Sequence, residues 1–278
     1  MNLALICNPA SGSGEGPSVE ELLRTEGADV ERFGLDEIDI ALERRPDRLI
    51  VAGGDGSIGP AAAAAARASL PLAVIAAGTA NDFASSQELP DDIAEAATLA
   101  AHGETIRPTD LGRMGERPFV NVASIGLAPV AAQQAEDAKD SLGPLAYAWG
   151  AVRAGISAAP VHCRISSGKR EVFDGDAWQA TIACSGAFGA GAEVEADPRD
   201  GMLDAVAVAA GSRARLLKMA YGLRAGRIES HREAASLRAP SFRVELEAPE
   251  SFNVDGEVVE SGSVDFSVEA RAFDLVVG

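Results

Sequence analysis

The chain has 278 residues, enough for one large domain or two small ones, and its 24% charged and 47% hydrophobic residues are typical of a globular fold. The formal net charge of −18 disfavours DNA or RNA as a partner. No apolar run reaches the roughly 18 residues of a membrane span, and residues 1–12 lack the basic start of a signal peptide, so we expect a cytoplasmic protein. Cys7, Cys163 and Cys184 have no CxxC spacing, which argues against a disulfide scaffold or a zinc site.

Apolar runs alternate with helix-like segments over the first hundred residues. We predict strands at residues 2–7, 29–33, 48–52 and 72–76, and helices at 18–26, 38–44, 61–68 and 91–101. Pro60 precedes the alanine-rich segment 61–68, at a place where the first turn of a helix tolerates proline. Strands that alternate with helices in this way predict a parallel α/β sheet.

After Asp110 the chain changes to short β-rich segments that are separated by Gly, Asp and Ser turns. Strands are expected within residues 117–126, 162–168, 171–186, 203–210, 241–248, 251–259 and 263–270, whereas 141–158 and 213–237 look helical. We therefore predict an α/β domain at residues 1–109 and a larger, mostly antiparallel β domain at 110–267. Residues 268–278 are expected to complete the first domain, because a lone terminal strand needs a sheet to join.

Glycine-rich loops follow three of the predicted strands, with the sequences NPASGSG, GGDGS and GTANDF. Ligands of open parallel sheets bind at the carboxyl ends of the strands, and the backbone N–H groups of such loops bind anions. The three loops together predict a phosphate, as part of a nucleotide. A single loop of this kind is also compatible with an ordinary turn, and neither GxGxxG nor GxxxxGK[ST] is present.

The order of the motifs resembles the catalytic domain of the diacylglycerol kinase family, which includes sphingosine kinases and bacterial lipid kinases and is distantly similar to NAD kinases. The similar segments, which span nearly the whole chain, are residues 8–12, 53–57, 78–84, 109–112, 119–127, 197–204 and 253–259. The resemblance implies an NAD-kinase-like α/β domain that binds the nucleotide and a β-rich domain that binds the lipid. The active site is then expected in the cleft between the two domains.

The resemblance also implies a kinase that uses ATP and Mg²⁺ to phosphorylate a lipid hydroxyl, with diacylglycerol as the expected acceptor. Two alternatives stay open: another lipid acceptor, such as a sphingoid base or phosphatidylglycerol, and a degenerate nucleotide-binding member without kinase activity. The residues that are implied to bind ATP and its metal are Asn8, Pro9, Ala10, Ser11, Gly12, Gly53, Gly54, Asp55, Gly56, Ser57, Ile58, Thr79, Asn81 and Asp82.

Three further roles follow from the resemblance. Asp110 is implied to hold magnesium through water, and Glu257 is implied to be the general base that accepts the proton of the lipid hydroxyl. A structural magnesium ion is implied at the Asp200 carboxylate and at the backbone carbonyls of Asp197 and Met202. From the residues alone, Asp255-Gly256 is also an ordinary hairpin signal, and residues 197–202 are also a plain turn before a strand.

Some positions depart from the family pattern. Ser13 and Ser85 stand where a basic residue is usual, and Gly59-Pro60 replaces polar and acidic residues. Arginines from elsewhere, weak ATP binding or loss of catalysis would each accommodate this change.

A basic segment bears on the partners. Residues 211–239 carry seven positive and two negative side chains, which suits either a peripheral contact with a membrane surface or a surface helix that packs on the β domain. The expected partner is a lipid at that surface, and a homodimer stays open.

Overall fold

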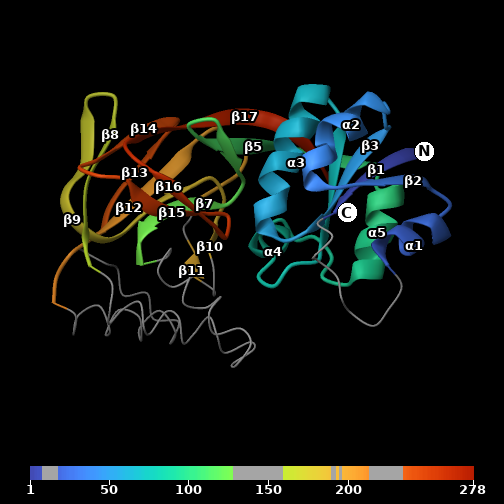
Figure 1. The fold of residues 1–278 in the computed structure, drawn as a ribbon, viewed down its shortest axis with the longest axis horizontal. Coiled ribbons are helices and arrows are strands. Elements are labelled where there is room, and N and C mark those ends of the chain that lie inside the picture. The colour runs from blue at the N-terminus through green and yellow to red at the C-terminus, as the bar shows by residue number, and fades with distance from the viewer. Residues whose placement is uncertain (8–17, 128–158, 189–191, 194–195, 213–233) are drawn as a thin grey trace.

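Four parallel strands form the sheet of the N-terminal half (Figure 1). They are β1 (Asn2–Cys7), β2 (Asp29–Phe33), β3 (Arg48–Gly53) and β4 (Pro71–Ala76), and they lie in the order β4-β3-β1-β2. The structure is a computed structural model and describes the chain except residues 8–17, 128–158, 189–191, 194–195 and 213–233.

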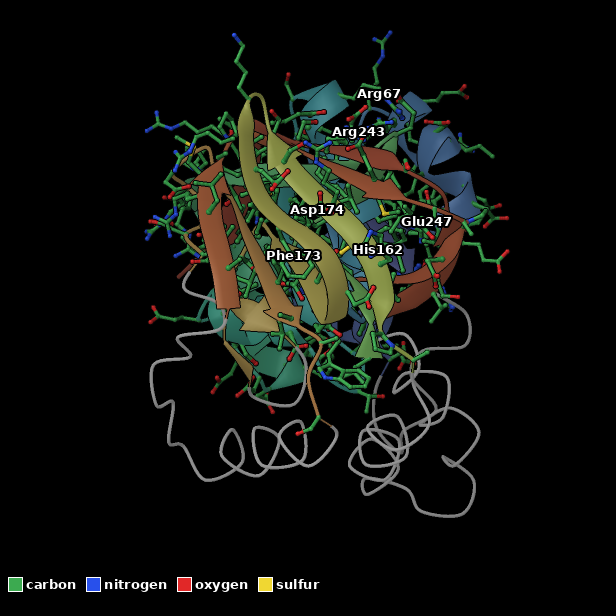
Figure 2. The ribbon with its side chains drawn as sticks, turned by 90° about the vertical axis from the view of Figure 1, so that its left-hand side faces the viewer. Arg67, His162, Phe173, Asp174, Arg243 and Glu247 are labelled. Atoms are coloured by element: carbon green, nitrogen blue, oxygen red, sulfur yellow. The ribbon has the colours of Figure 1, made fainter. Side chains whose placement is uncertain are left out.

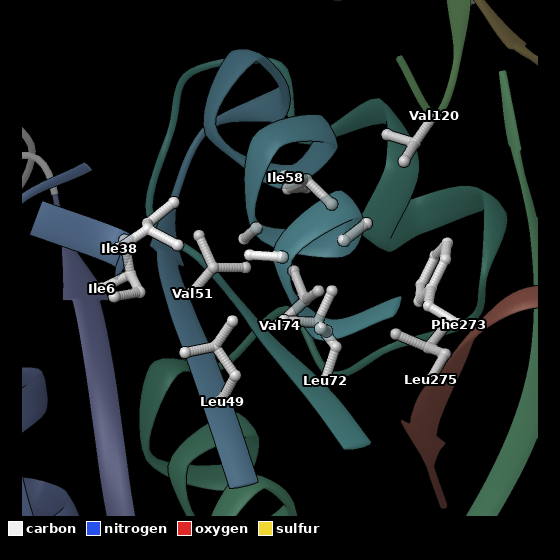
Figure 3. Packing of buried hydrophobic residues seen from close by; sticks show 14 of the residues in the cluster. Ile6, Ile38, Leu49, Val51, Ile58, Leu72, Val74, Val120, Phe273 and Leu275 are labelled. Atoms are coloured by element: carbon white, nitrogen blue, oxygen red, sulfur yellow. The ribbon is translucent and has the colours of Figure 1, made fainter. Parts of the chain in front are cut away.

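Helices cover both faces of this sheet. They are α1 (Val19–Thr25), the 3-10 helix η1 (Leu35–Glu37), α2 (Ile38–Glu43), α3 (Asp55–Ala68), α4 (Asp82–Ser86) and α5 (Ile93–His102). Ile6 and Val51 share a core with α2 and α3 (Figure 3), whereas Leu5 and Ile50 share a second core with α1 and α5. Successive residues of a strand face opposite sides, so strands that are buried on both faces must be apolar throughout. The predicted parallel α/β sheet is confirmed.

Helix α3 begins six residues before the predicted start at residue 61. It runs from Asp55, so Pro60 lies inside the helix, and its expected place in the first turn is wrong. The first turn contains glycine, serine and aspartate, whose weak helix propensity hid it in the sequence. Gly59 is buried against the backbone of Pro118, where a Cβ would lie 2.9 Å from the Pro118 carbonyl oxygen.

The second half is built of antiparallel strands, as predicted. They are β5 (Thr105–Met114), β6 (Arg117–Phe119), β7 (Val122–Gly126), β8 (Val161–Ser167), β9 (Arg170–Ala183), β12 (Leu203–Ala209), β13 (Ala234–Ala239), β14 (Ser241–Leu246), β15 (Glu250–Val254) and β16 (Glu257–Ser261), with β10 (Ala187–Phe188) and β11 (Ala192–Glu193) as a separate pair. A core that includes Phe119, Phe252 and Phe266 fills this half, and Phe119 meets Phe266 edge to face at 6.2 Å.

The helix that was predicted for residues 213–237 is wrong at its end. Residues 234–239 form β13, which pairs antiparallel with β12 from Leu203↔Ala239 to Val208↔Ala234. Alanine, leucine and arginine favour a helix locally, but the free backbone groups at the edge of β12 favour a strand, and tertiary pairing prevails. Residues 213–233 and the helix predicted at 141–158 lie outside the described residues.

Strand β17 (Val264–Val277) connects the two halves of the molecule, as Figure 1 shows along its upper edge. Its first residues pair antiparallel with β14, and near its end Asp274 and Leu275 pair in parallel with Pro71 and Leu72 of β4. β5 pairs with β17 on both sides of Thr109, so both halves belong to one mixed sheet. The domain boundary near residue 109 stays a prediction, since β5 continues through it.

Among the described helices, none combines the length and the apolar character that crossing a membrane requires.

Candidate active site between the two halves

Two of the glycine loops touch each other through their backbones. Gly53 ends β3 and Gly54 caps α3, while Ala77 after β4 donates its backbone N–H to the Gly53 carbonyl at 3.0 Å. A Cβ on Gly78 would lie 2.4 Å from the Gly54 Cα, closer than any side chain allows. Glycine is therefore required here for the approach of the two loops. The third loop, which contains Asn8, Pro9, Ala10, Ser11 and Gly12, lies outside the described residues.

Asp55 is the first residue of α3, and its carboxylate links three segments. It accepts backbone N–H groups of Asp82 (3.1 Å) and Phe83 (2.9 Å) at the start of α4, and the Asn121 side-chain amide at 3.0 Å. The Asn81 side chain bonds back to Gly78 instead of capping α4, so Asp55 caps this helix. Three of the roughly four acceptor positions of the carboxylate are occupied.

Asn121 joins the two halves of the molecule at this point. It is buried, its side-chain amide reaches Asp55, and its side-chain oxygen accepts the Ser185 hydroxyl at 2.8 Å. Its backbone N–H donates to Asp255 at 2.9 Å. Asn121 lies within residues 119–127, which carry part of the resemblance, but the sequence implied no role for this residue. Its position within a matched motif was the only signal available.

Asp255 lies in the hairpin between β15 and β16, with φ of 49° at Asp255 and 90° at Gly256, as a type I′ turn requires. Its carboxyl group also accepts the backbone N–H groups of Val120, Asn121 and Val122 at 2.7–3.0 Å. Burial raises the pKa of Asp255 to about 7, against these three donors, which lower it, and the nearby Asp55 carboxylate raises it further. The hairpin signal was correct, and the buried role of the aspartate was missed.

Glu257 follows this turn and meets the start of α3. A Cβ on Gly56 would lie 2.8 Å from Glu257 Oε1 and 2.9 Å from its Cγ, so the carboxylate side chain rests on Gly56. Its Oε2 accepts a hydrogen bond from the Arg117 guanidinium in an ion pair. The predicted base and the GGDGS loop, which are about 200 residues apart in the sequence, thus come together.

Asp110 is tied to the turn at residues 197–202. Its buried carboxylate accepts the backbone N–H groups of Gly201 and Arg271, both at 2.7 Å, and its own N–H donates to the Pro198 carbonyl. These described bonds lead to that turn and to β17 rather than to Asp55 or Glu257. The expected role of Asp110 as a water-mediated magnesium ligand stays a prediction.

The turn itself is arranged by arginines. The Arg199 guanidinium donates a hydrogen bond to the Asp197 carboxylate at 2.8 Å and forms an ion pair with it. The hydrogen bond and the charge of Arg199 both lower the pKa of Asp197. Asp200 pairs with Arg238 at 3.2 Å and accepts the Met202 backbone N–H at 2.9 Å. Of the ligands predicted at this turn, the Asp200 carboxylate is already paired with Arg238, and the other two are the backbone carbonyls of Asp197 and Met202. The structural magnesium ion stays a prediction, and we derive no chemistry from one.

A catalytic magnesium ion fits the chemistry at Asp55 better. Mg²⁺ in kinases is held by one or two carboxylates together with substrate phosphates, and Asp55 Oδ2 accepts only one of the three hydrogen bonds at this carboxylate. Within the part of the chain that the structure describes, no three His, Cys, Asp or Glu side chains form a metal site of their own.

The other predicted ligand residues differ in what they can offer. The Ser57 hydroxyl bonds back to the Gly54 carbonyl at 2.7 Å, and Ile58 is buried in the core beneath α3, so only its backbone could face a ligand. Thr79 is exposed. A separate hollow of about 230 Å³ is lined mostly by ionisable side chains, including His162 and Asp174, and contains none of the predicted residues. Figure 2 labels both of these side chains, which belong to β8 and β9.

Comparisons with known proteins agree with this arrangement. The model of the diacylglycerol kinase catalytic domain matches residues 2–114, and the model of the YegS C-terminal NAD kinase beta sandwich-like domain matches residues 121–277, more than half of the chain. The fold is similar to that of a diacylglycerol kinase from Bacillus anthracis (TM-score 0.78, 22% identity, covering 100% of this chain and 97% of that one). It is also similar to an NAD kinase from Archaeoglobus fulgidus in complex with ATP (TM-score 0.52, 12% identity, covering 99% and 92%).

Two relatives show how far the similarity in sequence extends along the chain. A Klebsiella pneumoniae protein named "Probable lipid kinase YegS-like" is 31% identical over 195 residues, which are 68% of this chain and 64% of that protein. A diacylglycerol kinase from Staphylococcus saprophyticus is 28% identical over 269 residues, or 91% of this chain and 88% of that protein. The matched part of this chain therefore spans just under two thirds of the Klebsiella relative.

The fold defines a two-domain protein of the NAD-kinase-like class, with an N-terminal α/β domain and a C-terminal β sandwich-like domain. Within that class, the chain belongs to the diacylglycerol kinase family of lipid kinases.

Proposed function

We propose that this protein is an ATP- and Mg²⁺-dependent lipid kinase that transfers the γ-phosphoryl group to the hydroxyl of diacylglycerol. The observation that carries the proposal is the contact between Glu257 and Gly56. It brings a carboxylate of the β half onto the N-terminal turn of α3, where a helix can bind phosphate.

The described residues support each part of the reaction. Phosphoryl transfer needs mainly positioning and neutralisation of charge, and a bound Mg²⁺ would supply part of that neutralisation beside Asp55. The start of α3 orients the triphosphate. Glu257 accepts the proton as the lipid oxygen bonds to the γ-phosphorus and the bond from phosphorus to the bridging oxygen breaks, and ADP departs with that electron pair.

The relatives support the choice of substrates. Two of them are named as lipid or diacylglycerol kinases, and a protein of the same fold is an NAD kinase that binds ATP. Ser85, which stands where the family often has a basic residue, is exposed on α4 and supplies no charge. A nucleotide-binding protein without transfer activity is therefore the competing function.

A transfer assay separates these functions. Labelled γ-phosphate from ATP is offered with diacylglycerol, a sphingoid base and phosphatidylglycerol, with and without EDTA. We expect labelled phosphatidic acid that disappears with EDTA, and a fall of about 10²–10⁴-fold in kcat for Glu257→Gln. Glu260→Gln is the matched control, because Glu260 is an exposed residue on the same strand.

Each other outcome has a clear meaning. Product on another lipid alone would change the acceptor, and ATP binding without any product would favour the non-catalytic protein. Full activity of Glu257→Gln would remove the base assignment.

A further inference from the structure

Negative charge dominates the described site, where the carboxylates of Asp55 and Glu257 lie at the start of α3. A triphosphate would add several more negative charges. The two positions where the family often carries a basic residue are Ser13 and Ser85, so the chain needs positive charge from another place.

Arg117 is a cation that the fold brings to this place. It begins β6, which pairs with the end of β5 through Met114↔Arg117. The next residue, Pro118, packs its carbonyl directly on Gly59 in the second turn of α3. The backbone of β6 is thus held against the helix whose N-terminus would face the phosphates.

The side chain of Arg117 points to the same turn. Its guanidinium bonds Oε2 of Glu257, whose Oε1 lies on Gly56. The side chain is 38% exposed, so it can change partner without leaving a buried charge behind. A guanidinium binds carboxylate and phosphate with the same planar pair of donors, which makes an exchange between the two chemically simple.

We propose that Arg117 binds the γ-phosphate of ATP and thereby replaces the missing basic residues. In the free enzyme it holds Glu257 in an ion pair over Gly56. When ATP binds, the guanidinium moves to the γ-phosphate oxygens, and Glu257 is free to accept the proton of the lipid hydroxyl. This inference rests on the proposed function, because it requires ATP at the start of α3.

The test compares ATP with ADP, which lacks the γ-phosphate. Binding of each nucleotide with Mg²⁺ is measured by titration calorimetry for the wild type, Arg117→Gln, Arg117→Lys and Arg113→Gln. Arg113 is the matched control, since it lies on the adjacent strand β5 and pairs with Glu269 at 2.7 Å, with no described contact to Glu257 or Gly56.

We expect Arg117→Gln to weaken ATP binding about 10–100-fold and to leave ADP binding unchanged, because one charge-assisted contact to the γ-phosphate is lost. Arg117→Lys should retain part of the ATP affinity, and Arg113→Gln should change neither nucleotide. If Arg117 had a merely structural role, its substitution would weaken the binding of ATP and of ADP to the same extent.

Failure of the inference and failure of the proposed function give different results. Suppose that the wild type binds ATP. If Arg117→Gln then loses affinity for ATP and ADP equally, or loses none, the role of Arg117 is overturned and the kinase proposal still stands. A wild-type protein that binds no ATP would overturn both. Thermal unfolding of the Gln variants, compared at the same pH, shows whether either change has altered the fold.

Discussion

At the scale of single residues, Asp255 joins stability to the geometry of the site. Its buried carboxyl group holds the backbone N–H groups of the segment that leads into β7, and the same segment places Asn121 against Asp55. Burial and the Asp55 charge raise the Asp255 pKa to about 7, whereas in the unfolded chain it returns to about 3.8. Folding therefore favours the protonated form over this interval.

This shift predicts a particular dependence of stability on pH. Between about pH 4 and 7 the folded protein binds one more proton than the unfolded chain. The contribution of Asp255 to the free energy of unfolding is therefore complete below about pH 4. It falls by up to about 1.4 kcal/mol per pH unit above that and is lost as the pH rises through 7. In Asp255→Asn, the free energy of unfolding should lose this slope. Urea unfolding at pH 5, 6, 7 and 8 measures it for both proteins, and equal slopes would contradict the shift.

Gly56 offers a second prediction at this scale. A Cβ there would meet Glu257 Oε1 at 2.8 Å, so Gly56→Ala must displace the carboxylate. The obstructing atoms are Oε1, Cγ and Cδ of an exposed side chain, which can move by rotation about its own bonds, and alanine suits a helix. We expect unchanged or slightly raised thermal stability with at least a tenfold loss of phosphoryl transfer.

The control for Gly56→Ala is Gly262→Ala, whose new methyl group meets nothing within 4 Å. It should leave transfer unchanged. Equal activity of the two variants would show that the position of Glu257 over Gly56 is unimportant for the reaction.

The candidate site was only partly predictable from the sequence. Asp55 and Glu257 followed from the order of matched motifs, and the structure brings their loops together through Gly56 and Asn121. Asn121 lies within a matched motif that gave it no role, and Arg117 lies outside the matched motifs. Their contacts depend on how β5, β6 and β7 pair with distant strands, and no local pattern encodes those partners.

At the scale of elements, α3 holds an internal proline at a cost. Pro60 has no N–H to donate to the Gly56 carbonyl four residues earlier, and its ring crowds that carbonyl. Its neighbour Gly59 has no Cβ to obstruct the proline ring, and it also permits the close contact with Pro118. The helix therefore tolerates Pro60 through Gly59.

Two substitutions should separate these effects. Pro60→Ala restores one helical hydrogen bond and should raise the free energy of unfolding by about 1–2 kcal/mol, less than the full cost of an internal proline because the unfolded chain also gains freedom. Gly59→Ala should lower it, since a Cβ would lie 2.9 Å from the Pro118 carbonyl oxygen. Urea denaturation measures both, and a destabilised Pro60→Ala would show that the proline stiffens α3 usefully.

The elements that could be predicted from the sequence are those that show a local run of apolar residues. The apolar runs of β1, β3 and β4 are buried on both faces, so composition alone identified them. The start of α3 and strand β13 depend on partners elsewhere: Asp55 reaches α4 and Asn121, and β13 completes the edge of β12. Local propensity contains no information about either partner.

At the scale of the whole molecule, β17 makes the two halves one structure. Its first part lies in the β half beside β14, and its last part carries Phe273 and Leu275 into the core beneath α3 (Figure 3). A substitution that destabilises the α/β core should therefore also lower the stability of the β half, because one continuous strand belongs to both. Independent domains joined by a linker would behave differently.

Leu275→Ala tests this coupling. The side chain is completely buried in the α/β core, so its truncation should cost about 2–5 kcal/mol.

Both tryptophans, Trp149 and Trp178, belong to the second half of the sequence, and Trp178 is buried there. If the halves unfold as one unit, tryptophan fluorescence and far-ultraviolet circular dichroism should show the same lowered urea midpoint. A fluorescence transition that stays at its wild-type position while the circular dichroism splits would show that the β half unfolds alone. In that case β17 would connect the halves without coupling their stability.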